Sequence, residues 1–225
     1  MIFLALILGE NEKRSIRLRR KIAERLARFL KIQVEVQGTF PEEAFVGVVN
    51  HRSYIDSVCV FKEVDACPVV KSEVARWPII GFGLKQTATV FVERENKSSR
   101  KATRSSIAEF VKRGISTIVF VEGTTYVGPE TGEFRPGTFM TAAEHALPIV
   151  PIAIEFEKEE AAWVGDDTFV PHFLSYFAKN KQTKVKVSFG PVLRHSQWDK
   201  LRYDAHQWIN EELGRMQKDF KSKSD

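Results

Sequence analysis

His51 and Asp56 are the residues whose types and spacing most suggest chemistry in this chain. They follow an apolar run, residues 46–49, that is typical of a buried strand. An imidazole beside a carboxylate can act as a general base. On one continuous helix the two side chains would lie about 140° apart and could not touch. If the helix begins only at Ser53, however, His51 lies in the preceding loop and can reach Asp56.

The same residues permit a purely structural interpretation. Ser53 and Asp56 match the Ser-x-x-Asp pattern of a capping box, in which both side chains bond free amides at a helix start. The two interpretations are compatible, because capping would hold Asp56 in a fixed position. The spacing alone leaves both open.

Two further predicted strands also end in polar or charged residues. The strand at 89–92 leads into Glu93-Arg94, and the strand at 117–121 leads into Glu122-Gly123-Thr124. Taken singly, each resembles an ordinary strand-to-loop junction. Ligands of open α/β sheets bind beyond the carboxyl ends of the strands. An imidazole, a cation and a carboxylate gathered there would suit general-base attack on an activated acyl group beside an anionic substrate.

The elements that must position these groups alternate between strands and helices. We find no internal repeat and no low-complexity linker in the sequence, and therefore expect one α/β domain with a largely parallel or mixed central sheet flanked by helices. The long glycine-rich loop at 124–137 favours a functional role. The predicted strands are 34–36, 46–49, 68–70, 89–92, 117–121, 149–156 and 185–189. The predicted helices are 53–63, 98–113 with Gly114 as its C′ residue, 139–146, and a C-terminal amphipathic helix opened by a second capping pattern at Ser196-Gln-Trp-Asp199.

Basic charge is concentrated near the N-terminus. The chain carries +5, but residues 10–31 hold nine Lys/Arg and three Asp/Glu, a net +6. As a helix, this segment has one apolar and one basic half, and only Arg19 falls on the wrong side. After an aliphatic tip at 2–8, too short to span a bilayer that needs about 20 residues, it fits a membrane-interface anchor on anionic lipid. We therefore expect residues 1–31 to form the apolar tip and the interfacial helix. Residues 32–225 should form the α/β domain.

Two alternatives for this basic helix stay open, and other classes of site are disfavoured. The helix could pack on its own domain, or it could bind nucleic acid, although no aromatic or base-reading motif accompanies it. Cys59 and Cys67 predict buried, reduced thiols instead of a disulfide framework. The histidines have no metal-ligand spacing with either cysteine, so we expect no metal site.

Four blocks of residues occur in order between positions 46 and 156. They are Asn50-His51-Arg-Ser-Tyr-Ile-Asp56, then Lys71-Ser-Glu73 with Trp77-Pro78, Gly81 and Val90-Phe-Val-Glu93-Arg94, then Phe120-Val-Glu122-Gly123-Thr124, and finally Leu147-Pro148-Ile-Val-Pro151-Ile. Together they resemble the motifs of the 1-acylglycerol-3-phosphate acyltransferases and related glycerolipid acyltransferases, whose first motif is His-x4-Asp. Four blocks in order favour the catalytic interpretation of His51 and Asp56.

The resemblance implies a membrane-associated O-acyltransferase. Such an enzyme moves a fatty acyl group from a thioester, on coenzyme A or acyl carrier protein, to the free hydroxyl of a lysolipid. His51 would remove the hydroxyl proton and Asp56 would orient the imidazole. Arg94 would hold an anionic headgroup, and Glu122-Gly123-Thr124 would shape the acceptor pocket. The resemblance implies no bound cofactor, and a peripheral or monotopic protein at the cytoplasmic face of a membrane.

The third block departs from the family pattern Phe-Pro-Glu-Gly-Thr-Arg at Val121 and Thr125. In the family that arginine helps to hold the acceptor's phosphate, and here Arg135 of the same loop could supply the cation. We expect 1-acylglycerol-3-phosphate as the acceptor, with lyso-ornithine lipid or another lysophospholipid as the alternative. A non-catalytic protein that binds lipid or nucleic acid is the alternative of another class.

Overall fold

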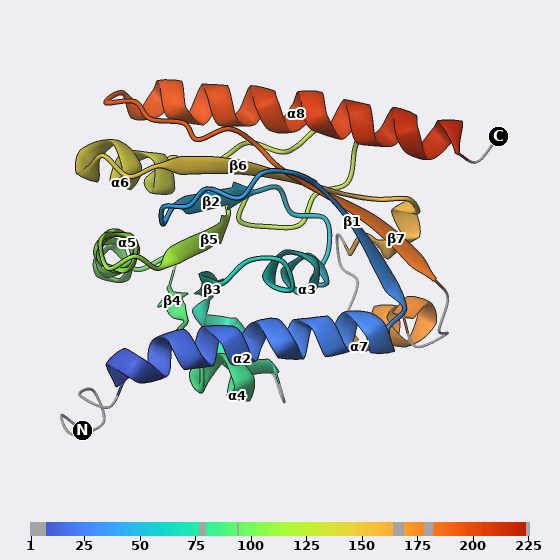
Figure 1. Cartoon of the computed structure of the whole chain (residues 1–225), viewed down its shortest axis with the longest axis horizontal. Helices are drawn as coiled ribbons and strands as arrows, with labels where there is room; N and C mark the ends of the chain where they lie inside the picture. The colour runs from blue at the N-terminus through green and yellow to red at the C-terminus, as the bar shows by residue number, and fades with distance from the viewer. Residues whose placement is uncertain (1–7, 77–79, 94, 164–168, 178–181, 224–225) are drawn as a thin grey trace.

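Seven strands form one sheet in the order β1-β7-β6-β2-β5-β3-β4 (Figure 1). Neighbouring strands pair in parallel, except that β6 and β7 are antiparallel. The mixed α/β sheet expected from the sequence is confirmed. The strands are β1 (Ile32–Gly38), β2 (Val46–Val49), β3 (Ala66–Lys71), β4 (Val90–Val92), β5 (Ser116–Phe120), β6 (Ile149–Phe156) and β7 (Thr183–Phe189).

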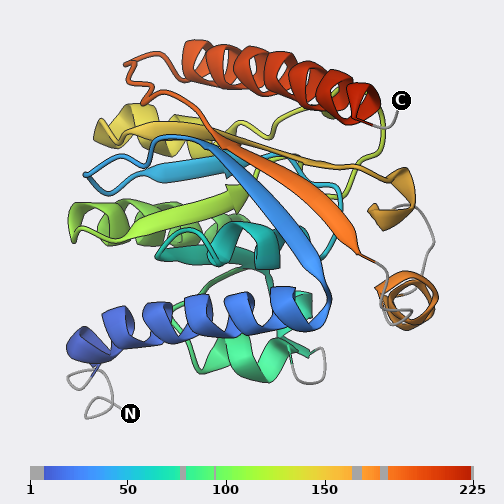
Figure 2. The same cartoon turned by 45° about the vertical axis from the view of Figure 1, so that its right-hand side comes forward.

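Helices cover both faces of this sheet in the computed structural model, which describes residues 8–76, 80–93, 95–163, 169–177 and 182–223. Buried side chains of α2 and α3 pack on one face, and those of α5, α6 and α8 pack on the other. Figures 1 and 2 show the long helices α2 and α8 on opposite sides. The helices are α2 (Leu8–Phe29), α3 (Asp56–Phe61), η1 (Ser72–Arg76), α4 (Ile80–Lys85), α5 (Lys97–Lys112), α6 (Gly137–His145), η2 (Glu159–Ala161), α7 (Phe169–His172), η3 (Phe173–Phe177) and α8 (Trp198–Ser222).

Helix ends differ from the sequence prediction where a capping pattern was the only signal. At α5, the Asn96 side chain accepts a bond from the Ser99 amide, and Gly114 takes φ +79° just past the end, as predicted. At α8, the predicted cap at Ser196 is wrong. Gln197 precedes the first helical residue and makes no side-chain cap bond, so Ser196 lies one position too early. The short helices between residues 159 and 177 were not predicted.

Helix α2 packs on the domain through one face. Ala23, Ala27 and Leu30 belong to the core, and Ile16 packs beside β3 and β4. Arg19, the one cation on the predicted apolar side, donates to the backbone oxygens of Ala66 (2.8 Å) and Ala88 (2.6 Å). Burial lowers the pKa of Arg19 to about 10, so its guanidinium stays protonated at neutral pH. Arg19 therefore fastens α2 to the edge of the sheet.

The two cysteines both lie in the interior of the domain. Cys59 and Cys67 are free and buried, as predicted, and burial raises the pKa of the Cys67 thiol to about 12. Neither thiol is ionised at neutral pH, which makes both poor nucleophiles.

Candidate active site

Strand β2 delivers the motif to the carboxyl edge of the sheet. Its four residues are buried and pair with β5 on one side and β6 on the other, so β2 is a central strand. Directly after it, the side-chain amide of Asn50 bonds the backbone of Ile154. Its Nδ2 donates to the Ile154 carbonyl oxygen (3.0 Å), and its Oδ1 accepts from the Ile154 backbone N–H (2.8 Å). This pair ties the end of β2 to β6 and fixes where His51 leaves the sheet.

His51 and Asp56 are in contact, as the spacing allowed. Nδ1 of His51 lies 2.7 Å from Oδ2 of Asp56, and the Asp56 side chain is fully buried while that of His51 is 22% exposed. A carboxylate only accepts hydrogen bonds, so Nδ1 carries the proton and Nε2 is left as the basic nitrogen. The arrangement can take a proton from a substrate that reaches the exposed edge of the ring.

Asp56 is held by the loop more than it caps the helix. Its Oδ2 also accepts the backbone amides of Arg52 (2.6 Å) and Ser53 (2.8 Å). Helix α3 begins at Asp56, three residues later than predicted, and the buried Ser53 hydroxyl has no hydrogen-bond partner among the described residues. Only one half of the predicted capping box is therefore formed.

Glu122, two residues past the end of β5, supports the same loop. Its Oε1 accepts the His51 amide and its Oε2 accepts the Gly132 amide, both at 2.7 Å. Burial raises the pKa of Glu122 above its ordinary value, although the two backbone amides oppose that shift. The Phe120 ring stacks on the His51 imidazole, with ring centres 4.4 Å apart. Glu122 thus contacts the backbone of the motif and of the 124–137 loop.

Gly123 and Arg135 lie against each other. Gly123 has φ +76°, a backbone conformation that favours glycine, and a Cβ atom there would lie 2.4 Å from Nε of Arg135, so any larger residue would displace the arginine side chain. Nε of Arg135 donates to the backbone carbonyl oxygen of Glu122 at 3.3 Å. The guanidinium therefore sits beside the third block. Thr124 is exposed and Thr125 half-buried, whereas Arg94 and Trp77-Pro78 lie outside the described residues.

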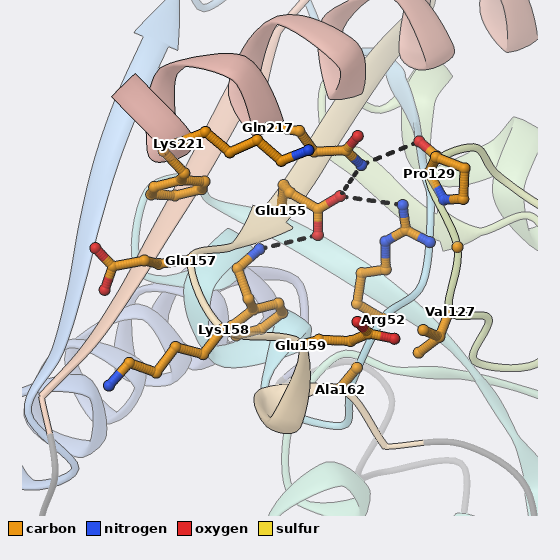
Figure 3. Close-up of a pocket in the computed structure, with 13 residues that line it drawn as sticks. Arg52, Val127, Pro129, Glu155, Glu157, Lys158, Glu159, Ala162, Gln217 and Lys221 are labelled. Carbon is orange, nitrogen blue, oxygen red and sulfur yellow. Dashed lines mark hydrogen bonds and ion pairs between the residues drawn. The ribbon is translucent and has the colours of Figure 1, made fainter. Parts of the chain in front are cut away.

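Arg52, which the sequence interpretation did not single out, is 2% exposed. It lines a cavity of about 650 Å³ together with residues of β6, the 124–137 loop and α8 (Figure 3). His51 and Asp56 are not among the residues that line this cavity. The available signal was an arginine in the motif that follows a buried strand, but the partners of its side chain lie more than 70 residues away.

The segment between β6 and β7 also reaches the motif. The Trp163 amide donates to the Arg52 oxygen (2.9 Å), and the Tyr54 hydroxyl lies 2.9 Å from Nδ1 of His172. Nε2 of His172 lies 3.0 Å from the Ala162 oxygen, which only accepts, so Nε2 is the nitrogen that donates and Nδ1 is the one that faces the Tyr54 hydroxyl. These contacts add a wall to the site that the sequence did not predict.

A family model described as Acyltransferase matches residues 31–155, more than half of the chain. The chain belongs to the Acyltransferase family. The motif with His51 and Asp56, and Glu122, fall within the matched residues, whereas α8 lies outside them. This result confirms the family resemblance of the four sequence blocks.

The relatives of this chain are named as acyltransferases of different lysolipids. The chain is 29% identical over 161 residues to a lyso-ornithine lipid O-acyltransferase of Pseudomonas aeruginosa, covering 69% of this chain and 62% of that protein. It is 30% identical over 176 residues to one of Rhizobium meliloti, covering 70% and 57%. It is 22% identical to a 1-acyl-sn-glycerol-3-phosphate acyltransferase of Neisseria gonorrhoeae, covering 71% and 65%. The chain thus spans about six tenths of the length of these relatives.

The fold also has a solved counterpart. The crystal structure of the 1-acyl-sn-glycerophosphate acyltransferase PlsC from Thermotoga maritima superposes with a TM-score of 0.67 at 20% identity. The match covers 96% of this chain and 86% of that one, so the two proteins share an overall fold.

Proposed function

We propose that this protein transfers a fatty acyl group from an acyl thioester to the free hydroxyl of a lysolipid. The observation that carries the proposal is the 2.7 Å contact between His51 and a fully buried Asp56 at the carboxyl edge of the sheet. Family membership supports the choice of acyl transfer over other reactions of a histidine–carboxylate pair. The donor in this proposal is a thioester of coenzyme A or of acyl carrier protein.

In the proposed reaction, Nε2 of His51 removes the proton from the lysolipid hydroxyl. The hydroxyl oxygen attacks the thioester carbonyl carbon and forms a tetrahedral intermediate. Its collapse breaks the carbon–sulfur bond, and the imidazolium returns its proton to the leaving thiolate. Asp56 keeps the imidazole in the required tautomer and stabilises the imidazolium while it exists. The proton thus passes from the hydroxyl to the thiolate, and the acyl group passes from sulfur to oxygen.

Two acceptors are supported by different observations. The Arg135 guanidinium beside Gly123 supports 1-acylglycerol-3-phosphate, because it places a cation next to the block where the family arginine is missing. The hydroxyl at Thr125 and the lyso-ornithine lipid acyltransferases among the relatives support lyso-ornithine lipid. Purified protein should therefore be assayed against both lysolipids with acyl-CoA and with acyl-ACP. Failure to acylate any lysolipid with either donor would refute the proposed function.

We further propose that α2 binds the surface of an anionic membrane. Four exposed apolar side chains, Leu18, Ile22, Leu26 and Phe29, form a stripe about 80° wide on the helix. Exposed basic residues run along one side of the stripe: Arg14, Arg17, Lys21, Arg25 and Arg28. Apolar area beside cations is what interfacial helices use on anionic lipid. No helix in the described part of the chain is long and apolar enough to cross a bilayer.

A further inference from the structure

The start of the 124–137 loop is bonded by two side chains from distant parts of the chain. Nη1 of Arg52 donates to the oxygens of Tyr126 (3.0 Å) and Glu130 (3.2 Å). Nε2 of Gln217, on α8, donates to the Pro129 oxygen at 3.0 Å. Three of the five carbonyls between residues 126 and 130 are therefore held by side chains, where exposed loops commonly rely on water.

Glu155 joins these two donors. Its Oε2 accepts from Nη2 of Arg52 (3.1 Å) and from Nε2 of Gln217 (2.8 Å), as Figure 3 shows. Glu155 is 9% exposed, so its carboxylate and the Arg52 guanidinium neutralise each other away from bulk water. We call Arg52, Glu155 and Gln217 the loop clamp.

The loop clamp is continuous with the catalytic motif. Arg52 follows His51 in the chain, its amide donates to Asp56, and the Tyr126 amide donates to the His51 oxygen at 2.8 Å. The clamped carbonyls begin one residue after Thr125. A shift of the clamp therefore moves the loop relative to His51 without touching the reacting atoms.

We propose that Glu155 and Gln217 are positioning residues that set acceptor specificity by holding the 124–137 loop in register with His51. The inference rests on the proposed function, because it assigns that loop to the acceptor. It makes α8, outside the matched family region, part of the site's support. A salt bridge that served stability alone would not need to converge on the carbonyls of one loop.

The sharpest test is Gln217→Glu, with Gln207→Glu on the exposed face of the same helix as the matched control. The variant places a second carboxylate at the 2.8 Å contact with Glu155. At pH 8 the two charges repel, and the acceptor KM should rise about tenfold, the equivalent of one charge-assisted hydrogen bond. Near pH 5.5 a proton shared by the two carboxylates removes their repulsion but does not replace the donor to the Pro129 oxygen, so the KM ratio of variant to wild type should fall but stay above one. Gln207→Glu should show neither effect.

Two further measurements separate positioning from stability. The double variant Glu155→Gln/Gln217→Glu removes the repulsion between the two carboxylates, but residue 217 still cannot donate to the Pro129 oxygen. Acceptor affinity should therefore recover only in part. Amide hydrogen exchange over residues 124–132 should quicken in Gln217→Glu and slow only partway back in the double variant, whether or not an acceptor is known. An active wild type with unchanged KM, acceptor preference and loop exchange in Gln217→Glu overturns the clamp, even if its melting temperature falls. A wild type that acylates no lysolipid overturns the proposed function, while loop exchange still tests the clamp.

Discussion

His51 and Asp56 meet at a single carboxylate oxygen that also accepts two backbone amides of the intervening loop. The backbone that follows the histidine therefore fixes the aspartate. The conformation of residues 51–56 in turn sets the orientation of the imidazole. A side chain held in this way loses little freedom when the imidazole becomes charged.

Replacing either member of the pair should remove most of the activity. We expect His51→Ala to lower kcat about 10²–10⁴-fold, the usual share of a positioned general base. Asp56→Asn should cost a similar factor, since a neutral amide cannot stabilise the imidazolium, while its oxygen still accepts the loop amides. Steady-state kinetics with a melting curve for each variant checks both expectations. Full activity in either folded variant would return the motif to a structural role.

Glu122 should make stability depend on pH. Burial raises its pKa above the ordinary 4.5, so the folded state binds this proton more tightly than the unfolded chain. Its contribution is then fully present below pH 4.5 and declines as the pH rises through the raised value. The free energy of unfolding of wild type minus that of Glu122→Gln should therefore decrease between pH 4 and pH 7. Urea titrations at several pH values test this, and a difference that grows with pH would contradict it.

The exposed stripe of α2 should govern binding to vesicles. Neutralising Lys21 and Arg25 to glutamine should weaken binding to anionic vesicles by about 2 kcal/mol, near 1 kcal/mol for each cation at the surface. Leu18→Ser with Phe29→Ser should weaken binding further, because both side chains are exposed and their loss leaves the core intact. Cosedimentation at low and moderate salt is the measurement, and Lys218→Gln on α8 is the control.

Deleting residues 1–31 is a less selective test of the same idea. It should also reduce binding to anionic vesicles, but it removes Ala27 and Leu30 from the core and the Arg19 bonds to the sheet. A truncated protein that fails to bind could simply be misfolded. Vesicle binding that survives in a folded deletion variant would still refute the role of α2.

Restoring the family arginine should change acceptor preference. Thr125→Arg places a cation where the family holds a phosphate, and a charged hydrogen bond is worth about 1.5–3 kcal/mol. We expect the kcat/KM for 1-acylglycerol-3-phosphate to rise relative to that for lyso-ornithine lipid. If the ratio stays constant while Arg135→Ala abolishes use of the phosphate acceptor, Arg135 already provides the cation.

The sequence was most informative where the physical cause is local. Apolar runs placed β2 and β6 at their observed bounds, and the His51–Asp56 contact spans only five residues. The boundary of α3 was missed because half of the capping box is not formed. The loop clamp could not be predicted, since its bonds join residues 62 to 103 positions apart. Arg19 was visible only as an anomaly, because the carbonyls it bonds come from two distant segments.

The half-buried Arg19 also determines the rotation of α2 about its own axis. With one guanidinium fixed on two backbone oxygens of the sheet edge, the exposed stripe has a constant angle to the strands. On a bilayer the protein would then come to rest in one pose, with the His51 edge at a constant height and tilt. Lysolipid would arrive by lateral diffusion, so the reaction rate would follow the mole fraction of acceptor in the leaflet and not its concentration in bulk water.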